Sequence, residues 1–129
     1  MLKRVAQGVY LYSYSAHIGA TTIEDIAKNL RRGDYIFESL ESALSQYGVI
    51  SQVPISRITL MTTGRSGEFR TPYGIIEFTH TKAPISEIEE NILERPGHSL
   101  PIANKGYAYK NLRSVRRNLH LVDLEELDT

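Results

Sequence analysis

Two carboxylates and a lysine near the middle of the chain are the residues whose types could support a metal-dependent reaction. They are Glu68, Glu77 and Lys82, and a nuclease-like site would use the carboxylate oxygens to hold a divalent cation. Glu77 lies between Ile76 and Phe78, so in a strand its side chain points away from theirs, toward solvent or a second layer. We therefore favour a surface strand glutamate and keep a metal-dependent, nuclease-like enzyme as an alternative.

Other sequence patterns associated with catalysis are absent. Residues 64–68 read Gly-Arg-Ser-Gly-Glu, which lacks the Gly-x-Ser-x-Gly pattern of serine hydrolases. The four histidines are scattered without metal-ligand spacing, and the chain has no cysteine. We expect no catalytic set, no metal and no cofactor, and we interpret the chain as non-enzymatic.

Five cations near the C-terminus are the best candidates for binding a charged partner. Ala108, Leu112, Val115 and Leu119 recur at helical spacing, which predicts an amphipathic helix over residues 102–119. At about 100° per residue, the cations share another face of this helix. They are Lys105, Lys110, Arg113, Arg116 and Arg117. This face either binds phosphates or an acidic partner, or is a solvated surface that offsets the acidic tail at residues 123–128.

Residues 57–81 are expected to present a second charged surface. Two apolar runs predict two strands, and the glycine-punctuated loop between them carries Arg65, Glu68 and Arg70. Backbone N–H groups of residues 64–67 could form an anion nest beside the Arg65 guanidinium, although such glycine-bearing stretches are usually plain turns. We interpret the segment as a surface for binding, and not as a reaction centre.

The remaining elements predict the framework that positions these residues. Alternation over residues 2–14 indicates a half-buried strand, on which Tyr10, Tyr12 and Tyr14 form either a partner interface or a cover for the domain's own core. Helical spacing follows a threonine cap at residues 21–22, recurs over residues 39–47 and begins again at Pro84. These signals predict one α+β domain over residues 1–129. A small mixed or antiparallel sheet, built from residues 57–80 and the N-terminal strand, is packed by about four helices.

Composition limits the environment in which the chain works. The 129 residues include fifteen basic and fifteen acidic side chains, so no overall field favours nucleic acid or membrane. No apolar run is long enough to suggest a membrane span or a signal peptide. Together with the lack of cysteine, this predicts a soluble, cytoplasmic protein without a membrane partner.

Three passages of the chain resemble a known family. The opening residues read LKRVAQGVYLY, residues 39–54 and 57–81 read SLESALSQYGVISQVP and RITLMTTGRSGEFRTPYGIIEFTHT, and residues 108–127 read AYKNLRSVRRNLHLVDLEEL. They resemble, in order, the last strands of a winged-helix wing, the start of the second domain, and the terminal helix and tail of the AbiEi-type antitoxins. These are proteins of bacterial type IV toxin–antitoxin (abortive infection) systems.

The resemblance implies a non-enzymatic antitoxin and transcriptional regulator that counters a nucleotidyltransferase-like toxin. Family members carry a helix-turn-helix before the wing, whereas this sequence starts at about the wing, so operator recognition is not expected from these residues. Auxiliary DNA contacts are expected from Arg65, Arg70 and the basic face at residues 105–117. A general protein-interaction domain, with a basic helix that serves only solubility, is the remaining alternative.

Overall fold

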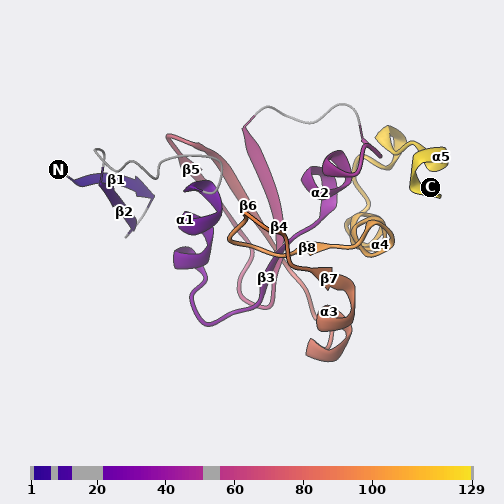
Figure 1. Cartoon of the computed structure of the whole chain (residues 1–129), viewed down its shortest axis with the longest axis horizontal. Coiled ribbons are helices and arrows are strands. Elements are labelled where there is room, and N and C mark those ends of the chain that lie inside the picture. The colour runs from indigo at the N-terminus through magenta and orange to yellow at the C-terminus, as the bar shows by residue number, and fades with distance from the viewer. Residues whose placement is uncertain (1, 7–8, 13–21, 51–55, 129) are drawn as a thin grey trace.

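The chain folds around a six-stranded mixed sheet with helices on both faces (Figure 1). The computed structural model describes residues 2–6, 9–12, 22–50 and 56–128. Within these residues the helices are α1 (Thr22–Leu30), α2 (Leu40–Gln46), α3 (Ile85–Asn91), α4 (Lys105–Val115), the 3-10 helix η1 (Leu119–Leu121) and α5 (Leu124–Leu127). The strands are β1 (Leu2–Ala6), β2 (Val9–Tyr12), β3 (Ile36–Glu38), β4 (Arg57–Thr62), β5 (Gly67–Thr71), β6 (Gly74–His80), β7 (Ile92–Leu93) and β8 (Ile102–Ala103). The predicted α+β class is confirmed.

The main sheet has the strand order β5-β6-β4-β3-β8-β7. The expected pair of strands joined by a loop is wrong, because the loop contains a third strand, β5. The chain runs from β4 to the sheet edge as β5 and returns as β6, which inserts between them, parallel to β4 and antiparallel to β5. Gly74 permits this return: its φ is 133°, and a Cβ atom there would lie 2.5 Å from the carbonyl oxygen of Ser56.

Alternating side chains divide the core between the two faces of the sheet. Ile58 and Leu60 of β4 pack with residues of α1, whereas Met61 packs in a second cluster with α2 and α4. This alternation is the two-residue period of a strand that is covered on both faces. The α2 and α4 side also contains the polar groups described below.

The N-terminal strand does not join the main sheet, contrary to the sequence prediction. Instead β1 and β2 pair with each other as an antiparallel two-stranded sheet, in which Leu2 lies opposite Tyr12 and Arg4 lies opposite Tyr10. Tyr14 lies outside the described residues, and the tyrosine interface stays a prediction.

The C-terminal helix is shorter than predicted. Residues 102–103 form β8, and the Asn104 side chain then caps α4 by accepting a hydrogen bond from the Tyr107 N–H at 2.8 Å. At the other end Arg116 has a left-handed φ of 54° and ends the helix. Among the described residues, no helix is long and apolar enough to cross a membrane.

Candidate functional site

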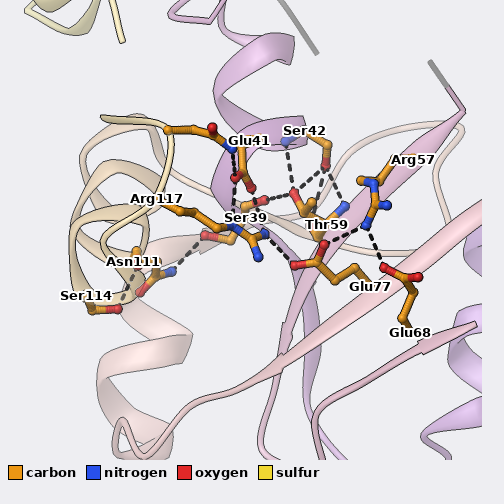
Figure 2. Close-up of polar contacts among 11 residues, drawn as sticks. Ser39, Glu41, Ser42, Arg57, Thr59, Glu68, Glu77, Asn111, Ser114 and Arg117 are labelled. Carbon is orange, nitrogen blue, oxygen red and sulfur yellow. Dashed lines mark hydrogen bonds and ion pairs between the residues drawn. The ribbon is translucent and has the colours of Figure 1, made fainter. Parts of the chain in front are cut away.

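Five side chains of alternating charge form a chain of ion pairs that runs across β5, β4 and β6 to α2 (Figure 2). Arg57 Nη1 lies 2.9 Å from Glu68 Oε1 and 2.7 Å from Glu77 Oε1. On the other side of Glu77, Arg117 pairs with it and also donates two hydrogen bonds of 2.7 and 2.8 Å to Glu41. Each arginine therefore bridges two carboxylates, and this chain of residues is called the charge chain below.

The sheet register explains why the arginines are needed. Glu68 of β5 lies directly opposite Glu77 of β6, and directly opposed like charges are destabilising. Arg57, on the neighbouring strand β4, sits between the two carboxylates and neutralises the repulsion. Glu77 points away from its apolar neighbours, as the sequence alternation predicted. Its side chain is only 15% exposed, however, so it is not the surface glutamate that we favoured.

The three residues of the nuclease-like alternative do not form one site. Both carboxylates are engaged by arginines, so a metal ion would have to displace a cation to reach them. Lys82 lines a separate pocket of about 310 Å³ beside α4, and neither Glu68 nor Glu77 lines that pocket. In the part of the chain that the structure describes, no cluster of three or more potential metal ligands is found.

A buried hydroxyl cluster beside the charge chain joins β4 and α4 to the start of α2. Thr59 Oγ1 donates to the Ser39 carbonyl at 2.6 Å and accepts from the Ser42 N–H at 2.9 Å. Ser42 Oγ accepts from the Thr59 N–H, and Asn111 of α4 donates to Ser39 Oγ at 2.8 Å. A helix N-terminus leaves its first N–H groups without partners in the helix. The Ser39 side chain does not cap α2, and Thr59 of β4 instead accepts the hydrogen bond from the Ser42 N–H.

Glu41 is the end of the charge chain that lies on α2. Burial alone would raise the pKa of its carboxyl group, but the hydrogen bonds from Arg117 and Asn118 outweigh burial and lower the pKa below its ordinary value. A depressed carboxyl pKa contributes stability that is present above the unfolded-state pKa and lost as the pH falls through the folded-state pKa.

Acidification is therefore expected to weaken the fold through Glu41. Urea unfolding between pH 7 and pH 3 should give a free energy of unfolding that falls once the pH drops below about 4.5. In Glu41→Gln this group no longer titrates, so the fall should be shallower, with lower stability at pH 7. Equal pH dependence in the two proteins would contradict the assignment.

The predicted basic face contains cations with two different environments. Arg117 lies beyond the end of α4 and is committed to Glu41 and Glu77. Lys105 Nζ donates to the Glu126 carbonyl at 2.8 Å, and Lys110 Nζ lies 3.8 Å from Glu87. These partners come from other elements, so spacing within the helix could not reveal them.

Two other cations of that face have no acidic partner among the described residues. Arg113 lies over the Tyr109 ring, with its guanidinium carbon 5.7 Å from the ring centre, and Arg116 is exposed at the helix end. The exposed side chains of Arg65 and Arg70 likewise have no ion pair in this part of the chain, although Arg70 lies on β5 and not in a loop. These four cations are available to a partner.

The turn that carries Arg65 is closely packed against the residues that follow α1. A Cβ atom at Gly64 would lie 2.3 Å from a carboxylate oxygen of Asp34, so this carboxylate already occupies the space beside Gly64. The Arg65 carbonyl accepts a hydrogen bond from Arg31 Nε at 2.9 Å. The turn is therefore held by Arg31 and Asp34, which follow α1.

Arg31 has a structural role that the sequence only partly indicated. As expected of a helix C-terminal cation, it donates to the Leu30 carbonyl at 2.9 Å. Its guanidinium also lies over the Phe69 and Phe78 rings, 5.2 and 4.5 Å from their centres. Burial, followed by the nearby Arg65 charge, lowers the pKa of Arg31.

The charged and hydroxyl groups of the arrangement pair with one another. Its acids and bases neutralise one another, and its hydroxyl groups are engaged in structural hydrogen bonds. Comparison of the chain with protein-family models, with curated proteins and with solved structures gives no match.

Proposed function

We propose that this chain is a non-enzymatic antitoxin and regulatory protein of a bacterial type IV toxin–antitoxin system. It counters a nucleotidyltransferase-like toxin in the cytoplasm, and it acts by binding. The proposal rests on the resemblance of three passages to AbiEi-type antitoxins. The structural observation that supports it is that the passages from residue 39 onward contact one another.

The passages from residue 39 onward converge on the charge chain and its hydroxyl cluster. Ser39 and Glu41 come from the passage at 39–54, Thr59 and Glu77 from that at 57–81, and Arg117 from that at 108–127. Segments that contact one another through buried polar groups are constrained together, because an unpaired buried charge is costly. This convergence is expected if the passages at 39–54, 57–81 and 108–127 belong to one functional domain.

Binding is the mode of action that the charge pairing supports. A general base or a metal ligand needs a lone pair that is free to react, and arginines occupy the carboxylates of the charge chain. The exposed cations, by contrast, are free to meet a partner of opposite charge.

Co-expression with the toxin encoded beside this chain tests the proposal. The chain should restore the growth of cells that express the nucleotidyltransferase-like toxin, and an empty vector should not. Failure of a well-expressed, folded chain to restore growth would refute the proposal.

We also propose auxiliary DNA contacts through the four available cations, Arg65, Arg70, Arg113 and Arg116. Because each neutralised phosphate releases condensed counterions, four contacts would weaken binding roughly 100-fold between 50 and 200 mM salt. Fluorescence anisotropy with duplex DNA should show this dependence. The double variant Arg113→Ala/Arg116→Ala should lower the salt slope by about two.

A matched control separates these contacts from general charge effects. Lys28→Ala removes an exposed cation from α1, which packs on the opposite face of the sheet from α4, and should leave the slope nearly unchanged. Salt-independent binding, or no binding at low salt, would contradict the DNA contacts without affecting the antitoxin proposal.

A further inference from the structure

The outer edge of β5 is an open end of the main sheet. β5 is the first strand in the order β5-β6-β4-β3-β8-β7, and within this sheet it pairs only with β6. The backbone groups on its other side have no hydrogen-bond partner in the part of the chain that the structure describes. Such an edge is a template for a further strand, and many proteins bind partners by adding one.

Two charged side chains of β5 remain available at this edge. Glu68 and Arg70 are two residues apart, so their side chains point to the same face of the sheet, and both are exposed. Glu68 ends the charge chain: its Oε1 atom pairs with Arg57, whereas its Oε2 atom has no partner within the described ranges (Figure 2). Arg70 has no ion pair in those ranges either. The edge therefore carries a carboxylate that can accept another cation, and a cation that lacks an acid.

A second copy of the same strand is complementary to this pattern. When two β5 strands pair antiparallel with their Phe69 residues opposite each other, Glu68 of each copy lies opposite Arg70 of the other. Directly opposed residues share a face of the sheet, so both new ion pairs form on the face that carries the charge chain. The alternation of charge then continues from Glu41 of one copy to Glu41 of the other.

The same charges disfavour the neighbouring registers. Shifting one strand by two residues places either Glu68 opposite Glu68 or Arg70 opposite Arg70, according to the direction of the shift. Directly opposed like charges are destabilising. A shift of one residue would instead bring the charged side chains of one copy onto the face of Phe69 in the other. The charge pattern therefore selects one register.

The opposite face of β5 adds an apolar contact. Phe69 is half-buried, and its ring packs edge-on against Phe78 with 5.9 Å between the ring centres. Directly opposed Cβ atoms of an antiparallel pair lie about 4.5–5.5 Å apart, which is within contact range for two aromatic side chains. The two Phe69 rings would therefore bury part of each other's remaining exposed surface.

The N-terminal hairpin is the other neighbour of this edge. β1 contacts β5 and β2 contacts α1, which places the hairpin toward the α1 face of the sheet. Glu68 and Arg70 point to the opposite face, where the charge chain lies. β1 pairs with β2 and not with β5, so the hairpin does not satisfy the backbone groups of the edge. It is the competing occupant of this edge.

We propose that two copies of the chain pair through their β5 edges, in a two-fold antiparallel arrangement that joins their main sheets into one. Because β5 has only five residues, the interface is smaller than the standard of about 1,600 Å², and the dimer is weak. Arg70 then contacts the second copy and not DNA, whereas Arg65, Arg113 and Arg116 stay exposed. This dimer goes beyond the antitoxin proposal and does not depend on it.

Sedimentation of the full chain over about 10 µM to 1 mM tests the pairing, because weak interfaces dissociate in this range. The wild-type chain should change from monomer toward dimer. Glu68→Arg and Arg70→Glu should each weaken self-association at least about tenfold, since either change places like charges opposite each other at both ion pairs. An equimolar mixture of the two variants should associate again, because one copy then presents two cations and the other presents two acids.

Two controls accompany the mixing experiment. Lys82→Glu makes the same change in charge away from β5 and should leave self-association unchanged. Circular dichroism checks the fold of each variant, because Glu68→Arg also removes a partner of Arg57. A measurement on the wild-type chain needs no variant: the ¹⁵N amide signals of residues 67–71 should shift with concentration, and those of residues 92–93 at the other sheet edge should not.

Three results would overturn the dimer. The wild-type chain would remain monomeric at the highest concentration, the mixture would associate no better than each variant alone, or the concentration-dependent shifts would lie outside β5. Cross-strand nuclear Overhauser contacts between β1 and β5 in a monomer would likewise overturn it, by assigning the edge to the hairpin. None of these outcomes bears on growth rescue from the toxin.

Discussion

Arg117→Ala is expected to lower the free energy of unfolding by about 3 kcal/mol. The Arg117 guanidinium makes a bidentate pair with Glu41, whose side chain is 6% exposed, and a further pair with Glu77. Removing it leaves a buried carboxylate with only Asn118 as a side-chain partner from the same segment. An uncompensated buried charge is costly because it loses its partner without regaining water. Urea denaturation at pH 7 measures the effect.

The control is Arg113→Ala, which removes an equally charged side chain four residues earlier. Arg113 is exposed and contacts the Tyr109 ring without an acidic partner in the described residues, so its loss should change stability by about 0.5 kcal/mol or less. If the two variants are equally stable, Arg117 is an ordinary surface cation and the charge chain does not hold the C-terminal segment to α2.

Phe37→Ala should cost about 4 kcal/mol, the largest effect that we expect from one substitution. Phe37 is 1% exposed, and its ring stacks on that of Tyr107 with 5.9 Å between the ring centres. It thereby joins β3, in the middle of the sheet, to α4. Truncation removes this contact and leaves a cavity that the surrounding core cannot fill completely.

Thermal or urea unfolding of Phe37→Leu provides the comparison. Leucine retains much of the buried volume while losing the ring contact, so the loss should be about 1 kcal/mol. If Phe37→Ala costs no more than Phe37→Leu, the position tolerates a cavity, and the packing of α4 on the sheet is looser than the structure indicates.

Local periodicity was sufficient for the elements whose signal lies within a few residues. Both helices before the sheet's longest strands were predicted, because caps and apolar spacing are local. The orientation of Glu77 away from Ile76 and Phe78 was also predicted, since a strand alternates its side chains, but its burial by arginine partners was not. The α+β class followed from these elements together.

Contacts between distant segments were not predictable in the same way. Glu41 and Arg117 are 76 residues apart, so neither helical spacing nor charge patterning indicates that they pair. The insertion of β6 between β4 and β5 depends on sheet pairing, which apolar runs alone do not specify. Helix α4 was predicted too long because the apolar spacing continues past Arg116, where the backbone turns left-handed.

The burial of carboxylates was likewise not predictable from the sequence. Glu24 has the position of a helix-start acid, which is normally solvated, yet it is buried by the segment 94–101. The only sequence signal was its spacing from Ile23 and Ala27, which places it near the apolar side of α1. Burial of a charge depends on its distant partners.

Growth rescue from the cognate toxin tests the central claim most directly, when the variant Lys82→Ala accompanies the wild-type chain. Lys82 is exposed and is the member of the nuclease-like set that can be removed without opening the charge chain. A non-enzymatic antitoxin predicts that the wild-type chain and Lys82→Ala restore growth equally at matched expression. No rescue by the well-expressed wild-type chain, or rescue that is lost in Lys82→Ala while the protein stays folded, would contradict this account.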